Sequence, residues 1–209
     1  MKNILVILSS FLIFFSCKNA EDKIEIYLLK ERIRSSEGVS LIEYAKKQNL
    51  PIEEEITSQA KANYDTLKKQ FIYGGKFDVI DKDISKKPLI EDNEVLGLNL
   101  SKSEFLLSTS GEKKIESLKP NMKFGIQFVI CVNRKPCLTG YFRSNISSYI
   151  YNWNYIGYDY FKHDDKTAHD KNFVIRQNAG YEKWKPILTK INEYPSLISA
   201  LKKTNRLHH

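Results

Sequence analysis

Residues 124–142 read FGIQFVICVNRKPCLTGYF and carry the clearest strand pattern in the chain. Large apolar side chains occupy every second position of the first half, which is the two-residue period of a β-strand. The polar stretch 133–136 then interrupts the pattern, as the turn of a β-hairpin does. We therefore expect an antiparallel hairpin whose second strand covers residues 137–142. The alternating apolar residues are Phe124, Ile126, Phe128, Ile130 and Val132.

The same hairpin contains two cysteines whose relation depends on the length of the turn. A three-residue turn, Asn133-Arg134-Lys135, would place Cys131 directly opposite Cys137 and allow a disulfide. A two-residue turn, Asn133-Arg134, would place Cys131 opposite Pro136 and send the two sulfur atoms to opposite faces of the sheet. An exported protein can retain a disulfide, so both alternatives stay open.

A second strand pattern follows the hairpin and is rich in aromatic residues. Tyrosine or tryptophan occupies every second position from 149 to 155, which predicts a strand with one aromatic face. Such a face is either the inner side of a strand covered by a C-terminal helix or an exposed strip that binds a glycan or an extended peptide. The candidate binding residues are Tyr149, Tyr151, Trp153 and Tyr155, with Arg143 at the rim.

The remaining periodicities predict short strands and a few amphipathic helices. We expect a single α+β domain over residues 24–209, with an antiparallel sheet packed against the helices. The expected strands cover residues 24–29, 77–80, 95–98 and 105–107, and the expected helices cover residues 40–51, 52–71, 109–120, 184–191 and 195–207.

The first residues are typical of an export signal. Lys2 precedes an apolar run that is shorter than the ~20 residues needed to span a bilayer. Its end, Phe14-Phe15-Ser16-Cys17, resembles the lipobox of bacterial lipoproteins, in the looser form of Bacteroidetes-type members. The resemblance implies that residues 1–16 are removed and that Cys17 receives acyl chains such as palmitate. Residues 17–23 would then tether the domain to a membrane of the cell envelope, for which we expect the outer membrane, on either its periplasmic or its surface face.

Residues 94–148 resemble the head subdomain of the first periplasmic domain of SecD-type export proteins. The similarity lies in the stretch LSTSGEKKI at 107–115 and in the stretch GIQFVICVNRKP at 125–136. Arg134 stands where the turn of that family prefers glycine. The resemblance implies a helix packed on an antiparallel sheet and does not imply an activity.

The chain has a formal net charge of +8, which suggests an anionic partner. The basic residues alternate with acidic ones, as in Lys30-Glu31-Arg32, so we interpret them as solvated faces and expect no nucleic-acid partner. Anionic lipid headgroups or glycans fit the excess charge better. The loop residues His163, Asp164, Asp165, His169 and Asp170 carry metal-ligand chemistry, but interleaved lysines favour a solvated loop, and we expect no metal and no cofactor.

The sequence contains no Gly-x-Ser-x-Gly elbow and no glycine-rich phosphate loop. We therefore expect a membrane-anchored binding or envelope-accessory protein that is not an enzyme. The alternatives are a secreted hydrolase whose site is assembled from distant residues, and an immunity-type protein that blocks a partner.

Overall fold

The hairpin predicted from residues 124–142 forms the centre of the fold. The computed structural model describes residues 21–119, 124–147, 149, 151–158, 173–178 and 186–209. Strand β7 (Ile126–Val132) pairs with β8 (Lys135–Ser144) through the two-residue turn Asn133-Arg134. Both turn residues have positive φ angles, 50° and 65°, as a type I′ hairpin turn requires. The hairpin prediction is confirmed, with the shorter of the two turns.

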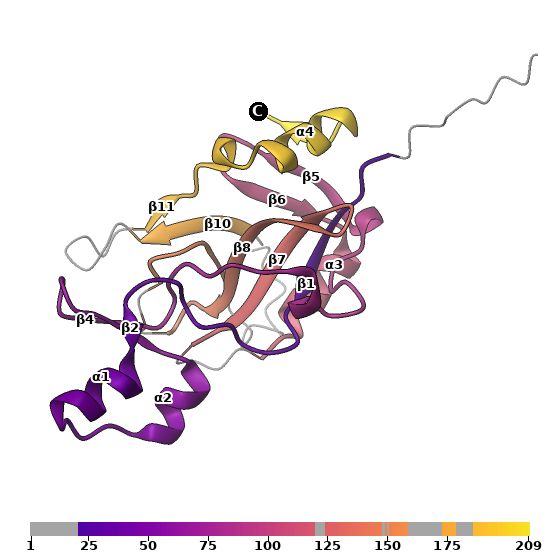
Figure 1. The fold of residues 1–209 in the computed structure, drawn as a ribbon. Helices are drawn as coiled ribbons and strands as arrows, with labels where there is room; N and C mark the ends of the chain where they lie inside the picture. The colour runs from indigo at the N-terminus through magenta and orange to yellow at the C-terminus, as the bar shows by residue number, and fades with distance from the viewer. Residues whose placement is uncertain (1–20, 120–123, 148, 150, 159–172, 179–185) are drawn as a thin grey trace, which may run out of the picture.

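Seven further strands extend this hairpin into a curved sheet among the described residues (Figure 1). Its order is β1-β7-β8-β9-β10-β6-β5-β12, and β11 pairs with β10. The pairs β8–β9 and β5–β12 are parallel, and the other pairs are antiparallel. The added strands are β1 (Ile24–Leu28), β5 (Val95–Asn99), β6 (Glu104–Leu107), β9 (Tyr155–Tyr158), β10 (Phe173–Asn178), β11 (Pro186–Leu188) and β12 (Leu207–His208).

One face of the sheet encloses the main hydrophobic core. Helix α4 (Pro195–Lys203) lies across this face and contacts β1, β7, β8 and β12, while α3 (Thr109–Glu116) packs beside β6. The even-numbered residues of β7, Phe128 and Ile130, point into this core together with Leu197 and Leu201 of α4. The α+β class is therefore confirmed, with the sheet as the larger component.

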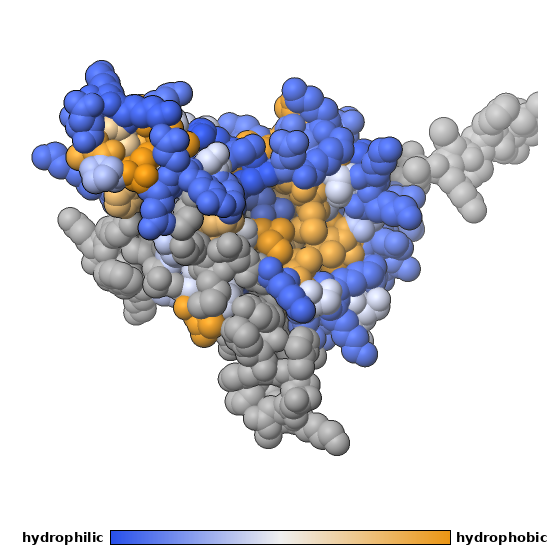
Figure 2. Space-filling view, turned by 90° about the horizontal axis from the view of Figure 1, so that it is seen from below, coloured by the Kyte–Doolittle hydropathy of each residue, from blue (hydrophilic) through white to orange (hydrophobic). Residues whose placement is uncertain are grey.

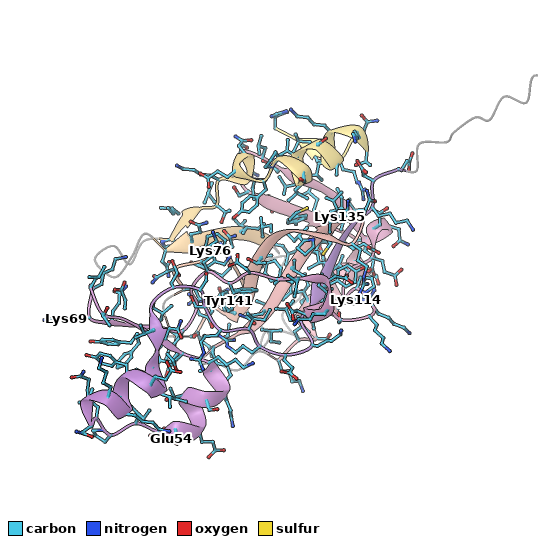
Figure 3. The ribbon with its side chains drawn as sticks, viewed as in Figure 1. Glu54, Lys69, Lys76, Lys114, Lys135 and Tyr141 are labelled. Carbon is cyan, nitrogen blue, oxygen red and sulfur yellow. The ribbon has the colours of Figure 1, made fainter. Side chains whose placement is uncertain are left out.

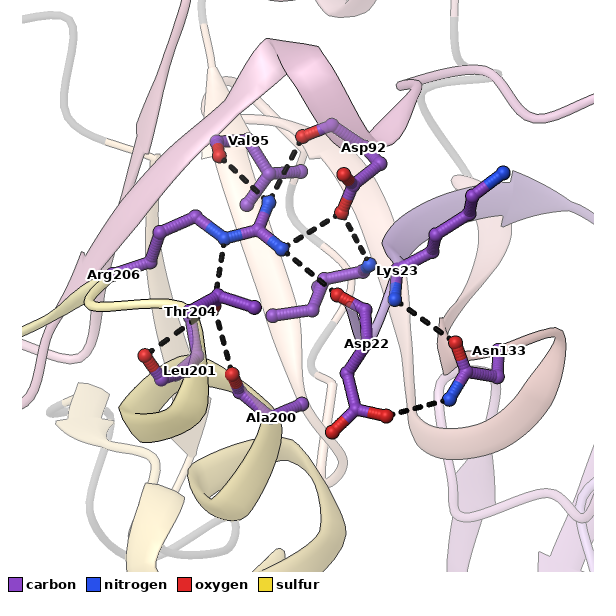
Figure 4. Close-up of polar contacts among 10 residues, drawn as sticks. Asp22, Lys23, Asp92, Val95, Asn133, Ala200, Leu201, Thr204 and Arg206 are labelled. Carbon is purple, nitrogen blue, oxygen red and sulfur yellow. Dashed lines mark hydrogen bonds and ion pairs between the residues drawn. The ribbon is translucent and has the colours of Figure 1, made fainter. Parts of the chain in front are cut away.

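An arginine of the C-terminal segment ties the two ends of the sheet together (Figure 4). The Nη2 atom of Arg206 donates to Oδ1 of Asp92 at 2.8 Å and to the carbonyl oxygen of Asp22 at 3.2 Å. The same Asp92 oxygen accepts from the backbone nitrogen of Ile24, the first residue of β1, at 2.7 Å. The start of β1 is thus fixed beside the segment that leads into β5 and β12.

The opposite face of the sheet is covered by irregular chain. Residues 29–36 and 73–84 cross it, and they bury two clusters, one around Tyr27 and Cys131 and one around Tyr141 and Tyr151. The expected strand at 77–80 is not formed, because this segment bonds to side chains: Thr139 donates to the carbonyl oxygen of Phe77.

A small unit extends from this face and holds three short strands and two helices. Figure 2 shows hydrophobic residues at this end of the molecule, on the left, surrounded by hydrophilic ones. The predicted helix over 52–71 is wrong beyond Ala60, because Lys61 adopts a left-handed φ of 45° that ends the helix, and residues 63–72 form a hairpin. The elements are β2 (Val39–Ser40), α1 (Leu41–Gln48), α2 (Glu54–Ala60), β3 (Asn63–Asp65) and β4 (Gln70–Ile72).

The C-terminal predictions are partly confirmed. Helix α4 lies within the predicted range 195–207, but the described part of 184–191 holds β11 and the start of the short 3-10 helix Ile191–Glu193 in place of an α-helix. Across the described segments, every helix is too short or too polar to cross a membrane.

The cysteines follow the two-residue alternative, and the disulfide is not formed. Cys131 pairs with Pro136, and both thiols are free. The sheet register shifts between Ile130 and Cys131, which leaves Cys137 as an extra residue of β8. Cys131 packs against Tyr27 and Ile84, whereas Cys137 faces the main core on the other side.

We predict that the two thiols react at different rates with an alkylating reagent. Cys131 is fully buried, and burial raises the pKa of its thiol to about 12, so it has little thiolate at neutral pH. Half-buried Cys137 should be labelled in the native Cys17→Ala chain, and Cys131 only after denaturation without reductant. A Cys137→Ser control should take up no label before denaturation. Mass spectrometry that finds no label after denaturation would reveal a disulfide and contradict this register.

Candidate anion-binding cleft

A charged segment, Lys30-Glu31-Arg32-Ile33-Arg34, leaves β1 and crosses the covered face of the sheet. Its backbone is fixed at two points. The Lys30 nitrogen donates to the carbonyl oxygen of Asp83 at 2.9 Å. The Ile33 backbone exchanges two hydrogen bonds, of 2.6 and 2.9 Å, with the side-chain amide of Gln127, which is buried on β7. The polar residue Gln127 is therefore buried because it pairs with this crossing chain.

Arg32 is bonded entirely to backbone. Its guanidinium donates to the carbonyl oxygens of Ala60 at 2.7 Å, Phe124 at 2.6 Å, Gly125 at 3.3 Å and Tyr73 at 2.8 Å. Its Cζ atom lies 5.2 Å from the ring centroid of Phe124 and 5.4 Å from that of Tyr141.

Within the part of the chain that the structure describes, no carboxylate forms an ion pair with Arg32. Burial lowers the pKa of its guanidinium, although an arginine stays charged in proteins. Its positive charge is therefore solvated by peptide dipoles and ring faces, and its formal charge is left uncompensated.

Arg34 is held from one side only. Its Nη1 atom donates to the carbonyl oxygen of Ala62 at 2.8 Å and to Oδ1 of Asn63 at 3.2 Å. Asn63 is buried and is itself fixed, because its Nδ2 atom donates to the carbonyl oxygens of Ser35 and Glu37 at 2.9 and 2.6 Å. The guanidinium of Arg34 therefore has a defined orientation.

These two arginines line a cleft of about 630 Å³. This volume is within the range of small-molecule sites, roughly 300–1,000 Å³. The lining holds five cationic and two acidic side chains, so it carries an excess of three positive charges, which favours an anionic ligand. The lining residues are Lys30, Glu31, Arg32, Ile33, Arg34, Lys61, Lys82 and Asp83.

The predicted aromatic strip is not a continuous exposed face. Only its last predicted residues, Tyr155 and Ile156, belong to a strand, β9, and Tyr151 and Tyr155 are buried while Tyr149 and Trp153 are half-buried. The cover comes from the crossing segments, through Leu29, Ile33, Phe77 and Val79, and not from a C-terminal helix.

Arg143 lies inside this aromatic cluster. Its Cζ atom is 5.2 Å from the ring centroid of Tyr151 and 4.9 Å from that of Tyr155. Its guanidinium also donates to the carbonyl oxygens of Ser144 at 3.4 Å and Ser147 at 2.9 Å. Arg143 thus packs against two rings of the cluster and is fixed by two backbone carbonyls.

The predicted lipidation site, Cys17, lies outside the described residues, as does the loop with His163, Asp164, Asp165, His169 and Asp170, for which we expected no metal. Over the described ranges, His, Cys, Asp and Glu do not gather in any group of three or more that could hold a metal. Cys131 and Cys137 are poor nucleophile candidates, because burial raises the pKa of each thiol.

The cleft does not follow from the sequence pattern, which predicts a solvated face for part of its lining. Lys30, Glu31 and Arg32 alternate in charge, which is typical of exposed chain. One signal was available: Ile33 is the single apolar residue in a charged stretch, and it marks the side that packs on the aromatic cluster.

We predict that Tyr151→Ala and Tyr151→Phe differ sharply in stability. Tyr151 is fully buried, so the truncation to alanine should lower the free energy of unfolding by ~3–5 kcal/mol. Its hydroxyl has no hydrogen-bond partner among the described residues, so the change to phenylalanine should be neutral or slightly stabilising. Urea unfolding of both variants measures this, and equal losses would show that the hydroxyl has a partner.

Comparison with known proteins gives no relative from which a function could be carried over. No protein-family model, no curated protein and no solved structure matches the chain.

Proposed function

We propose that this chain is an exported lipoprotein, anchored through lipid on Cys17, that binds an anionic ligand in the cleft and does not catalyse a reaction. The single observation that carries the binding proposal is the composition of the cleft, in which five cationic side chains face two acidic ones. Positive charge gathered in a concave site focuses the field and raises the local concentration of anions.

The rigidity of the lining supports a binding role. Arg34 is oriented by Ala62 and Asn63, and Lys30 is fixed by a 2.6 Å hydrogen bond from its Nζ atom to the carbonyl oxygen of Lys82. A ligand that meets fixed donors loses less affinity to the ordering of side chains.

The anchor proposal rests on the lipobox-like end of the apolar run, Ser16-Cys17. Figure 1 shows that the start of the described chain, just before β1, and the small unit lie at opposite ends of the molecule. A tether at Asp22 would therefore leave the small unit, with Lys61 at the end of α2, far from the attachment point.

The anchor is tested with Cys17→Ala. Acylation requires the cysteine thiol, so this variant should move from the membrane fraction into the soluble fraction, whereas the matched control Cys137→Ala should stay with the membrane. Fractionation in high salt, which removes proteins held only by charge, measures the distribution. Cys17→Ala protein that still pellets with membranes in high salt would refute the lipid anchor.

The cleft is tested with the double variant Lys61→Glu/Lys82→Glu, which reverses two of the five lining cations. We expect at least tenfold weaker binding of inorganic pyrophosphate, because the loss of hydrogen bonds to a charged group costs about 1.5–3 kcal/mol. The matched control Lys69→Glu/Lys113→Glu changes the net charge equally but lies outside the cleft; Figure 3 shows Lys69 at the outer edge of the small unit.

Isothermal titration calorimetry in 150 mM salt gives the affinities. Equal weakening in the cleft variant and in the control would mean that net charge, and not the cleft, attracts the anion. A wild-type chain that binds neither pyrophosphate nor sulfate nor citrate would refute the anion-binding function.

A further inference from the structure

We propose that Arg34 is the specificity-determining residue of the cleft and that it grips the terminal group of a phosphomonoester. This inference rests on the proposed anion-binding function and adds the class of ligand and the residue that selects it.

The first step is the geometry of the Arg34 guanidinium. Its Nη1 atom donates both to the carbonyl oxygen of Ala62 and to Oδ1 of Asn63. Because Asn63 is buried and fixed by two backbone carbonyls, the plane of the guanidinium is set before any ligand arrives.

The second step is the opposite edge of the same group. Among the described residues, Nε and Nη2 of Arg34 have no hydrogen-bond partner, and Arg34 lines the cleft. The Nε and Nη2 hydrogens of an arginine are parallel, and this fork matches two oxygen atoms of one phosphate or carboxylate group. Arg32 lacks this capacity, because its Nε and Nη2 atoms already donate to the carbonyl oxygens of Ala60 and Tyr73.

The third step distinguishes phosphate from carboxylate. The lining has a surplus of three positive charges, from five cations and two acids. A carboxylate supplies one negative charge and two oxygens, both of which the fork of Arg34 would use. A phosphomonoester carries about −1.5 to −2 charges at pH 7 and has three terminal oxygens, so one oxygen remains for a lysine.

Lysines suited to that third oxygen lie in the lining. Lys61 and Lys82 form no side-chain ion pair or hydrogen bond among the described residues, and a lysine binds phosphate as a mobile point charge. The cleft thus offers one fixed fork and two adjustable cations, which suits a dianionic tetrahedral group better than a planar monoanion.

The decisive experiment compares wild type, Arg34→Lys and the matched control Arg176→Lys, which lies on β10 outside the cleft. All three carry Cys17→Ala for solubility. The probes are glycerol 3-phosphate and glycerate, a carboxylate of similar size, titrated calorimetrically at pH 7.5 in 150 mM salt. Wild type and Arg176→Lys should bind the phosphate at least tenfold more tightly than the carboxylate, and Arg34→Lys should lose this preference.

Thermal unfolding shows whether Arg34→Lys is folded. The comparison of the two probes on wild type needs no variant, so it remains informative if Arg34→Lys does not fold. Equal wild-type affinity for the two probes would overturn the phosphomonoester class. A folded Arg34→Lys that keeps the preference would overturn the role of Arg34. If Lys61→Glu/Lys82→Glu still abolishes anion binding in either case, the proposed function stands. If wild type binds no anion at all, the proposed function fails as well.

A vesicle arm separates two sources of the phosphate. Phosphatidate vesicles present a phosphomonoester on a membrane, and phosphatidylglycerol vesicles present a phosphodiester of equal lipid type. Co-sedimentation with phosphatidate only, lost in Arg34→Lys, supports a lipid headgroup, whereas binding of glycerol 3-phosphate without co-sedimentation supports a soluble ester. Equal co-sedimentation with both vesicles would reflect charge alone and would count against the grip by Arg34.

Discussion

The guanidinium of Arg32 joins three parts of the chain that are distant in sequence. Its hydrogen bonds reach the end of α2 at Ala60, the segment after β4 at Tyr73, and the residues before β7 at Phe124 and Gly125. A buried charge without a counter-ion is unfavourable unless dipoles replace the lost water, and four carbonyl oxygens and two ring faces do so here. Removal of this side chain would leave those carbonyls without their donor, so the cost extends to every segment that it contacts.

The small unit depends on this joint because it shares little else with the sheet. Its three strands pair only with one another among the described residues. One backbone link is the isolated bridge between Gly74 and Tyr151, where a side chain on Gly74 would clash with the Tyr151 ring. Arg32 and Arg34 also bond to the small unit, Arg32 at Ala60 and Arg34 at Ala62 and Asn63. The residues that hold the small unit against the sheet therefore also line the cleft. An anion in the cleft would partly neutralise Arg32, which links ligand binding to the docking of the small unit.

Local patterns predicted the elements that obey a single period. The alternation of Phe124 to Val132 predicted β7. The pattern is clear because one face of this strand packs into the large main core. The same reasoning failed at 61–72, where helical spacing continues although Lys61 turns left-handed and a hairpin follows. The sequence left two lengths open for the turn after Val132, because an arginine at positive φ is uncommon, and the pairing of the strands shows that Arg134 adopts it.

The cleft could not be predicted because none of its contributors is distinctive in its own neighbourhood. Lysines 30, 61 and 82 lie in three separate polar stretches, and each is indistinguishable from a solvated surface residue until the fold brings them together. That convergence follows from the two faces of the sheet. The face toward α4 is filled by aliphatic and phenylalanine side chains. The polar segments that follow β1 and α2, and the segment around residue 82, therefore lie on the other face of the sheet, where they line the cleft. There Gln127, Thr139 and Tyr141 each donate a hydrogen bond to the chain that crosses them, at the carbonyl oxygens of Ile33, Phe77 and Gly75. The charge of the cleft is thus a consequence of which face of β7 and β8 carries polar side chains, and not of the net charge of +8.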